Sequence, residues 1–86
     1  MDAKLEELVS SAIATACNVD EAAISLETRL CDLGVDSISV VAIVAQVGAE
    51  HGLELSSDQL IELFDALIVR DFILLLQRAI LEQATQ

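Results

Sequence analysis

The sequence predicts an all-α protein, a small four-helix bundle, and three observations lead to this fold class. The 86 residues include no proline and only three glycines, so few positions interrupt a helix. Hydrophobic residues make up 55% of the chain, enough for a packed core, although only two residues are aromatic. Apolar residues also recur with helical spacing in several segments. A chain of this length forms one core but not two, so we expect residues 1–86 to be a single domain.

The first predicted helix runs from about Asp2 to Cys17. Its apolar residues recur at i, i+3, i+4, i+7, i+8 and i+11 and form one face. This periodicity fades in residues 18–35, where we expect a long ordered loop with a short helical turn at about residues 20–24. Loops of this length are uncommon in compact domains and are often functional. The face of the first helix consists of Leu5, Leu8, Val9, Ala12, Ile13 and Ala16.

The second predicted helix runs from about Ser37 to His51 and stops at Gly52, a residue type that commonly follows a helix. At 100° per residue, two separate stripes appear on it. We expect Val41 and a partly buried His51 at the edges of the core stripe. The other stripe has no obvious place in the core. The core stripe is Val40, Ile43, Val44 and Val47, and the second stripe is Ile38, Ala42, Ala45 and Ala49.

Two further helices complete the bundle. The segment "SSDQLIELF" opens with capping residues and predicts a short third helix that packs Leu60, Leu63 and Phe64. A last helix is expected from about Ile68 to Glu82. The architecture is therefore four helices, with a long loop between the first two and a short third helix. The core face of the last helix consists of Val69, Phe72, Ile73, Leu76 and Ile80.

The charge of the chain excludes one class of partner and favours another. Four basic and 15 acidic residues give a net charge of -11, which repels phosphate backbones and makes nucleic acid an unsuitable ligand. The same field attracts enzymes with basic docking surfaces, and it also keeps a small apolar domain soluble. Two cysteines, Cys17 and Cys31, form no disulfide framework, and no apolar run reaches the ~20 residues of a membrane span. We expect a cytoplasmic protein with reduced thiols.

Catalysis finds no support in the residues. The only histidine, His51, lies 14 residues after Ser37 in the same predicted helix, about 21 Å away along the axis. It cannot activate that serine as a general base. The chain has neither a glycine-rich phosphate loop nor a metal-ligand spacing. We therefore expect no enzyme and no metal site.

The stretch "DLGVDSIS", residues 32–39, places Ser37 at the start of the second helix. A phosphodiester on its hydroxyl would lie beside free backbone N–H groups and the positive end of the helix dipole. Ile38 would lie next to whatever the phosphate carries. Asp36 is the predicted N-cap. On helix physics alone, Asp36 and Ser37 could equally be no more than a capping pair.

This stretch resembles the 4′-phosphopantetheine attachment motif of acyl carrier proteins, in which D-S-[LI] follows L-G. The resemblance extends over nearly the whole chain, through the long first loop, "HGLEL" and "LFDALIVRDF". It implies an acyl-carrier-type bundle that carries acyl groups as thioesters on an arm attached to Ser37. It also implies that Asp36 contacts the phosphopantetheinyl transferase and that Ile38 supplies an apolar contact. Further partners would be ketosynthase, acyltransferase or other synthase enzymes, and we expect the carrier itself to be a monomer.

The second helix departs from the pattern of fatty acid carriers, which usually show acidic residues on its exposed side. Ala42, Ala45 and Ala49 stand there instead, and we interpret them with Ile38 as a partner-recognition stripe. Alanines are also good helix formers on a solvent-exposed face, which is the simpler interpretation. The departure favours a polyketide or specialised acyl system over housekeeping fatty acid synthesis. Two alternatives stay open: a peptidyl or aminoacyl carrier, against which Val35 argues, and an unmodified helical interaction module.

Overall fold

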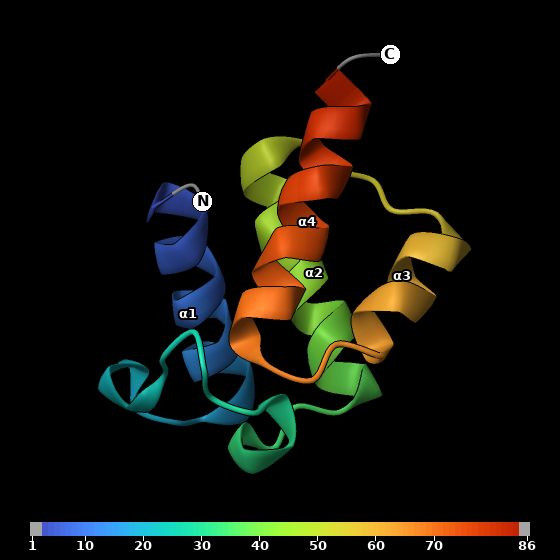
Figure 1. Ribbon diagram of the computed structural model, residues 1–86. Coiled ribbons are helices and arrows are strands. Elements are labelled where there is room, and N and C mark those ends of the chain that lie inside the picture. The colour runs from blue at the N-terminus through green and yellow to red at the C-terminus, as the bar shows by residue number, and fades with distance from the viewer. Residues whose placement is uncertain (1–2, 85–86) are drawn as a thin grey trace.

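A computed structural model describes residues 3–84, and these residues form four α-helices (Figure 1). The helices are α1 (Ala3–Cys17), α2 (Ser37–His51), α3 (Ser57–Phe64) and α4 (Val69–Ala84). No strand occurs among these residues, although Arg29 and Ile68 form an isolated antiparallel bridge. The all-α four-helix fold is confirmed, as are the short third helix and the predicted bounds of α2. The predicted start of the first helix at Asp2 lies outside the described residues.

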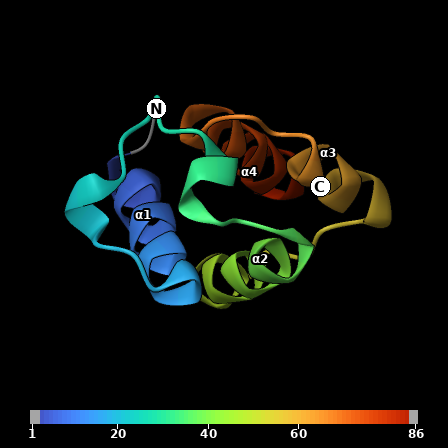
Figure 2. The same ribbon diagram turned by 90° about the horizontal axis from the view of Figure 1, so that it is seen from below.

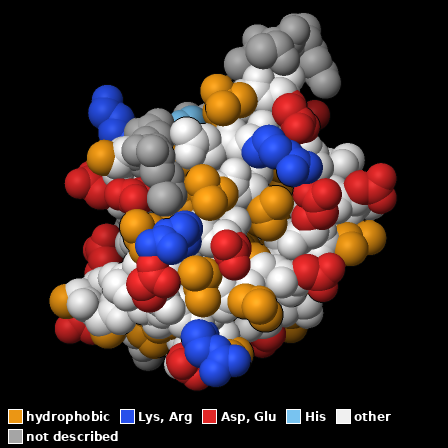
Figure 3. Space-filling model, in the orientation of Figure 1, with side chains coloured by type: hydrophobic (Ala, Val, Ile, Leu, Met, Phe, Trp, Pro, Cys, Tyr) orange, Lys and Arg blue, Asp and Glu red, His pale blue; other side chains and the backbone are white. Residues whose placement is uncertain are grey.

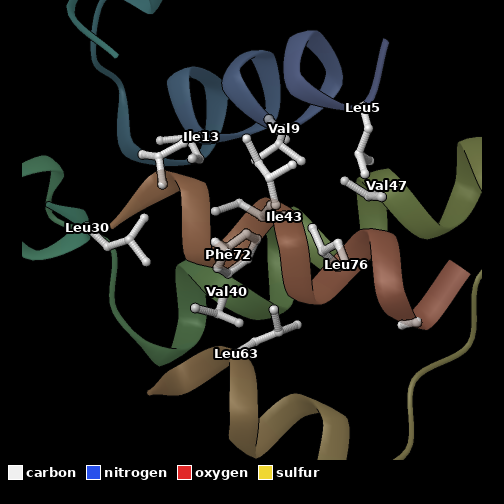
Figure 4. Packing of buried hydrophobic residues seen from close by; sticks show 14 of the residues in the cluster. Leu5, Val9, Ile13, Leu30, Val40, Ile43, Val47, Leu63, Phe72 and Leu76 are labelled. Carbon is white, nitrogen blue, oxygen red and sulfur yellow. The ribbon is translucent and has the colours of Figure 1, made fainter. Parts of the chain in front are cut away.

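The four helices surround one apolar core (Figure 2). Seen along the bundle, α2 and α4 lie on opposite sides of the core, with α1 and α3 at its other two edges. Figure 4 shows side chains from all four helices meeting in its centre. Burial of these aliphatic side chains and one phenylalanine drives the packing of the helices. The largest fully buried side chains are Phe72, Leu5, Ile13, Ile43, Ile73, Leu76, Val9, Val47 and Val69.

The helix faces predicted from spacing are largely correct, but they are wrong at the C-terminal ends of α1, α2 and α3. Ala16 and His51 are exposed, and Phe64 is 45% exposed. Ala16 and His51 belong to the last turns of α1 and α2, and Phe64 is the last residue of α3. At the end of α2 the chain turns at Gly52, so the buried Leu53 covers the core where His51 was expected. Four other predicted core residues are half-buried: Leu8, Val44, Leu60 and Ile80.

The long loop between α1 and α2 is ordered by two 3₁₀-helices. The first, η1 (Glu21–Ala23), confirms the predicted turn, and Asp20 caps it by accepting a hydrogen bond from the Ala22 N–H at 3.0 Å. The second, η2 (Leu30–Leu33), was not predicted. Both Leu30 and Leu33 of η2 are buried, so this turn anchors the loop on the core.

The loop is also tied to the start of α4 by backbone hydrogen bonds. The Leu30 N–H donates to the Leu67 carbonyl at 3.0 Å, and the Val69 N–H donates to the Thr28 carbonyl at 3.0 Å. The Arg70 N–H donates to the Leu26 carbonyl at 2.9 Å, and its guanidinium pairs with Glu27. Segments about 40 residues apart in sequence are thus held together, the loop on one side and the start of α4 on the other.

Candidate attachment site at the start of α2

Ser37 is the first residue of α2, and its side chain is exposed. Asp36 precedes it as the N-cap, with extended backbone. The Asp36 Oδ1 atom accepts a hydrogen bond from the Ser39 N–H at 2.8 Å, and the Asp36 carbonyl accepts one from the Val40 N–H at 2.9 Å. The predicted cap is therefore confirmed. The Ser37 hydroxyl forms no hydrogen bond with another described residue, so capping does not occupy it.

The cap also determines the charge next to Ser37. The hydrogen bond from the backbone N–H of Ser39 holds the pKa of Asp36 below its ordinary value of 3.8, because it stabilises the ionised form. The side chain of Ser39 and the N–H of Ile38 act in the same direction. A carboxylate at the positive end of the α2 dipole is also favoured. Asp36 therefore carries a negative charge next to the Ser37 hydroxyl, which forms no hydrogen bond with another described residue.

The approach of the loop explains why this pair projects into solvent. Leu33 is buried, and the next residue, Gly34, has a left-handed φ of 80° that ends η2. Few residues other than glycine adopt this conformation without strain. Val35 is half-buried, and its N–H donates to the Leu30 carbonyl at 3.1 Å. The chain is therefore pinned up to Val35 and then turns outward at Asp36 and Ser37.

The outer side of α2 is exposed and uncharged near the serine. Ile38 is 78% exposed, and Ala42, Ala45 and Ala49 are exposed along the same helix. Val41 is exposed as well, although its phase placed it at the edge of the core stripe. A signal for it was present, because Val41 stands at i+3 from Ile38 and at i-4 from Ala45. The predicted stripe of Ile38, Ala42, Ala45 and Ala49 is thus exposed along one helix, and Val41 extends it.

A hollow of about 170 Å³ lies between η2 and the α3–α4 connection, and Val35, two residues before Ser37, is part of its lining. The end of α3 and the α3–α4 connection form one wall, and η2 forms the other. Phe64, which the sequence predicted in the core, contributes to the wall formed by the end of α3. Most of the lining is apolar, with one guanidinium. The lining residues are Arg29, Leu30, Cys31, Val35, Leu63, Phe64, Ala66 and Leu67.

Two other expectations from the sequence concern the role of His51 and a membrane-spanning helix. His51 lies at the opposite end of α2, so it cannot act on Ser37. Within residues 3–84, no helix is both long and apolar enough to cross a membrane. The residues around Ser37 therefore provide an accessible hydroxyl, a neighbouring negative charge and an exposed apolar surface.

An exposed serine at a capped helix start, in an all-α bundle with this loop, is the arrangement that the resemblance to acyl carriers predicts. Residues 7–66 match the family model described as a phosphopantetheine attachment site. The match covers more than half of the chain, so the protein belongs to this family of phosphopantetheine-binding carriers. No curated protein matches the chain.

Membership of the family specifies the cofactor. Domains of this family attach 4′-phosphopantetheine covalently, and the protein is a phosphopantetheine-bearing carrier. The exposed hydroxyl of Ser37, with no competing hydrogen bond, fits such an attachment. Carriers of this family are generally non-catalytic and interact with phosphopantetheinyl transferases and synthase enzymes.

Proposed function

We propose that Ser37 is the attachment residue and that the protein carries acyl groups as thioesters on the attached arm. The observation that supports this proposal is the exposed Ser37 hydroxyl beside the ionised Asp36 cap. In the transfer, the Ser37 oxygen bonds to the phosphorus of the pantetheine phosphate of coenzyme A. Adenosine 3′,5′-bisphosphate leaves, and the serine proton passes to the transferase. The thiol of the arm would then hold the acyl group.

The residues around Ser37 would serve the two kinds of partner in different ways. Asp36 offers its charge to the transferase at the moment of attachment. Ile38 and Val41, with Ala42, Ala45 and Ala49, offer an apolar surface to the synthase enzymes. Because α2 carries only one acidic residue, Glu50, this docking would depend on apolar contact more than on charge. That balance supports a polyketide or specialised acyl system over housekeeping fatty acid synthesis. We further propose that residues 1–86 act as one domain in the cytoplasm.

Intact-mass measurement after incubation with a phosphopantetheinyl transferase and coenzyme A tests the attachment residue. The wild-type protein should gain the mass of the arm, about 340 Da. The Ser37→Ala variant should gain nothing while keeping its helical circular dichroism. Ser39→Ala is the matched control, because Ser39 lies two residues further along the same turn and should leave the modification intact. A modified Ser37→Ala protein would place the arm on another serine, and an unmodified wild type would contradict the carrier function.

The acyl system can be tested with the loaded protein. Acyl transfer from the holo-protein to ketosynthases of a polyketide system and of a fatty acid system should be faster for the former. The rate of the same enzymes on their own carriers provides the reference. Faster transfer to the fatty acid ketosynthase would overturn the assignment of the system but not of the carrier function.

A further inference from the structure

A groove of about 350 Å³ lies between the end of α3 and the first half of α4. Its apolar lining consists of Ala66, Leu74 and Leu75, and Leu74 is 46% exposed. The rest of the lining is acidic, and Figure 3 shows red acidic side chains beside orange apolar ones where α4 and α3 meet. This combination distinguishes the groove from the outer side of α2, which is apolar and almost uncharged.

The acidic residues that line the groove differ in their partners. Glu62 of α3 pairs with Arg78 of α4 at 3.3 Å, and Arg78 also pairs with Glu82 at 3.3 Å. The carboxylates of Asp65 and Asp71 make no ion pair or hydrogen bond with another described residue. Within residues 3–84, only Glu62 of the three lining acids is therefore paired with a cation.

The helical register explains why each side of the groove has an aspartate without a partner. Asp71 stands seven residues before Arg78, so both lie on nearly the same side of α4. Asp65 stands three residues after Glu62 and directly follows α3. Opposite charges join the two helices where Glu62 meets Arg78, whereas Asp65 and Asp71 present like charges. In a chain of net charge -11, these two carboxylates favour a cation from outside.

An arginine side chain matches both the acidic and the apolar part of the groove. Its planar guanidinium has five N–H donors and can pair with two carboxylates at once, and its methylene stem can lie on the leucines. Arg78 pairs in this way with Glu62 and Glu82. A lysine ammonium is compact and strongly hydrated, so it fits this surface less well. A metal ion would make no use of the apolar lining.

We propose that this groove binds an arginine of a partner protein, in a basic segment whose neighbouring apolar side chain covers Leu74. The guanidinium pairs with Asp65 and Asp71, and the stem lies on the apolar lining. Helix α2 lies on the opposite side of the core from α4, so a partner in the groove leaves Ser37 and the outer side of α2 free (Figure 2). The groove is therefore a second docking surface, and it does not depend on attachment of the arm.

Titration of the 86-residue chain with the peptide acetyl-Leu-Arg-Leu-amide, followed by NMR, tests the groove. The backbone amide signals of residues 62–66 and 71–75 should shift, and those of residues 37–45 on α2 should not. Because exposed ion pairs are weak, we expect a dissociation constant on the order of 1–10 mM. The peptide with lysine in place of arginine should bind about threefold more weakly or worse.

Two double variants separate the groove from the general charge of the chain. Asp65→Asn combined with Asp71→Asn should weaken binding about fivefold or more, because the guanidinium loses both carboxylates. Glu7→Gln combined with Glu21→Gln is the matched control. It removes the same number of charges from exposed residues of another acidic hollow, beside α1, and should change binding less than about twofold. Equal weakening by both double variants would overturn the proposal.

Two leucine variants test the apolar part of the contact. Leu74→Ala removes the exposed leucine of the groove and should weaken binding about threefold. Leu81→Ala changes another exposed leucine of α4, one that does not line the groove, and should leave binding unchanged. A peptide that shifts the α2 amides as strongly as those of the groove would overturn the proposal. The absence of any shift at about ten times the expected dissociation constant would overturn it as well.

Discussion

At the scale of single residues, Asp36 and Ser37 are neighbours with separate tasks. The Asp36 carboxylate satisfies the N–H of Ser39 at the open end of α2, and the Ser37 hydroxyl stays unbonded. Because the cap comes from the aspartate, the serine can be modified without loss of a structural hydrogen bond. This division answers the ambiguity in the sequence, where the pair could have been two capping residues and nothing more.

Asp36→Asn should separate the two properties of the cap. Asparagine caps a helix about as well as aspartate, so the melting temperature should change little. The charge offered to the transferase is lost, and we expect slower attachment of the arm to Ser37. Melting curves and modification rates measured on the same samples check this. An unchanged rate together with an earlier melt would show that Asp36 serves the fold alone.

The lowered pKa of Asp36 also predicts a pH dependence of stability. A carboxyl whose pKa is lowered on folding stabilises the fold at pH values above its unfolded pKa. That contribution is lost as the pH falls from the ordinary value of 3.8 through the lower folded pKa. Over this range, the free energy of unfolding of the wild type should therefore fall relative to that of Asp36→Asn. Urea titrations at several pH values measure the difference, and a constant difference would contradict the prediction.

Residue burial was predictable only where the local pattern decides it. Asp36 was predicted as a cap because capping depends on the next three residues. The exposure of Phe64 and His51 depends on where the chain goes after the helix ends. The spacing of apolar residues contains no information about that, so their burial was predicted wrongly.

At the scale of elements, the outer stripe of α2 can be tested against the core. Ala42→Glu and Ala45→Glu should each change stability by only a few tenths of a kcal/mol, because exposed helix positions tolerate glutamate. The same changes should slow acyl transfer to the native synthase enzyme, since an unpaired charge would be buried in the contact. Thermal melts and transfer rates decide the matter. Equal transfer rates for variants and wild type would leave the stripe without a function.

The C-terminal end of α2 makes a second prediction, on Gly48. A Cβ atom there would lie 2.9 Å from the carbonyl oxygen of Leu53, which belongs to the backbone and cannot move freely. Gly48→Ala should therefore destabilise the protein, by about 1–3 kcal/mol, although alanine normally stabilises a helix. Ala49→Gly, at the next and exposed position, should cost about 1 kcal/mol from chain entropy alone. Urea unfolding compares the two, and a stabilised Gly48→Ala would refute the close contact.

Elements differed in how far the sequence specified them. The bounds of α2 were predicted because Asp36 and Gly52 mark both ends locally, the glycine with a left-handed φ of 62°. The turn η2 was missed because its supports are distant. Its first residue, Leu30, donates a hydrogen bond to Leu67, and no pattern within the loop reveals that partner. The hollow between η2 and the end of α3 was missed for the same reason.

At the scale of the whole molecule, the net charge of -11 is spread over a chain with few basic residues. The repulsion among these charges opposes the compact state and is screened by salt. Raising the ionic strength from about 0.01 M to 0.15 M shortens the Debye length from about 30 Å to 8 Å. If the weaker repulsion between acidic residues stabilises the folded state by about 1 kcal/mol, the melting temperature should rise by roughly 4–8 °C.

A salt series near the isoelectric point, about 4.1, provides the control for that melt. Acidic and basic charges nearly balance there, so the same increase in salt should have little effect. A melting temperature that falls with salt at neutral pH would mean that the ion pairs of Arg70 and Arg78 outweigh the general repulsion.

The hydrogen bonds between the loop and the start of α4 join residues 26–30 to residues 67–70, so we expect these two segments to unfold together. The amides of Leu30, Val69 and Arg70 can exchange their hydrogens only when this junction opens, so they should exchange together. The family match ends at residue 66, before α4 begins. A polypeptide that contained only the matched residues would keep the motif but lose the anchor of the loop that presents it. A transferase that recognises Asp36 and Ser37 in their native arrangement would therefore modify only chains in which α4 has packed against the loop.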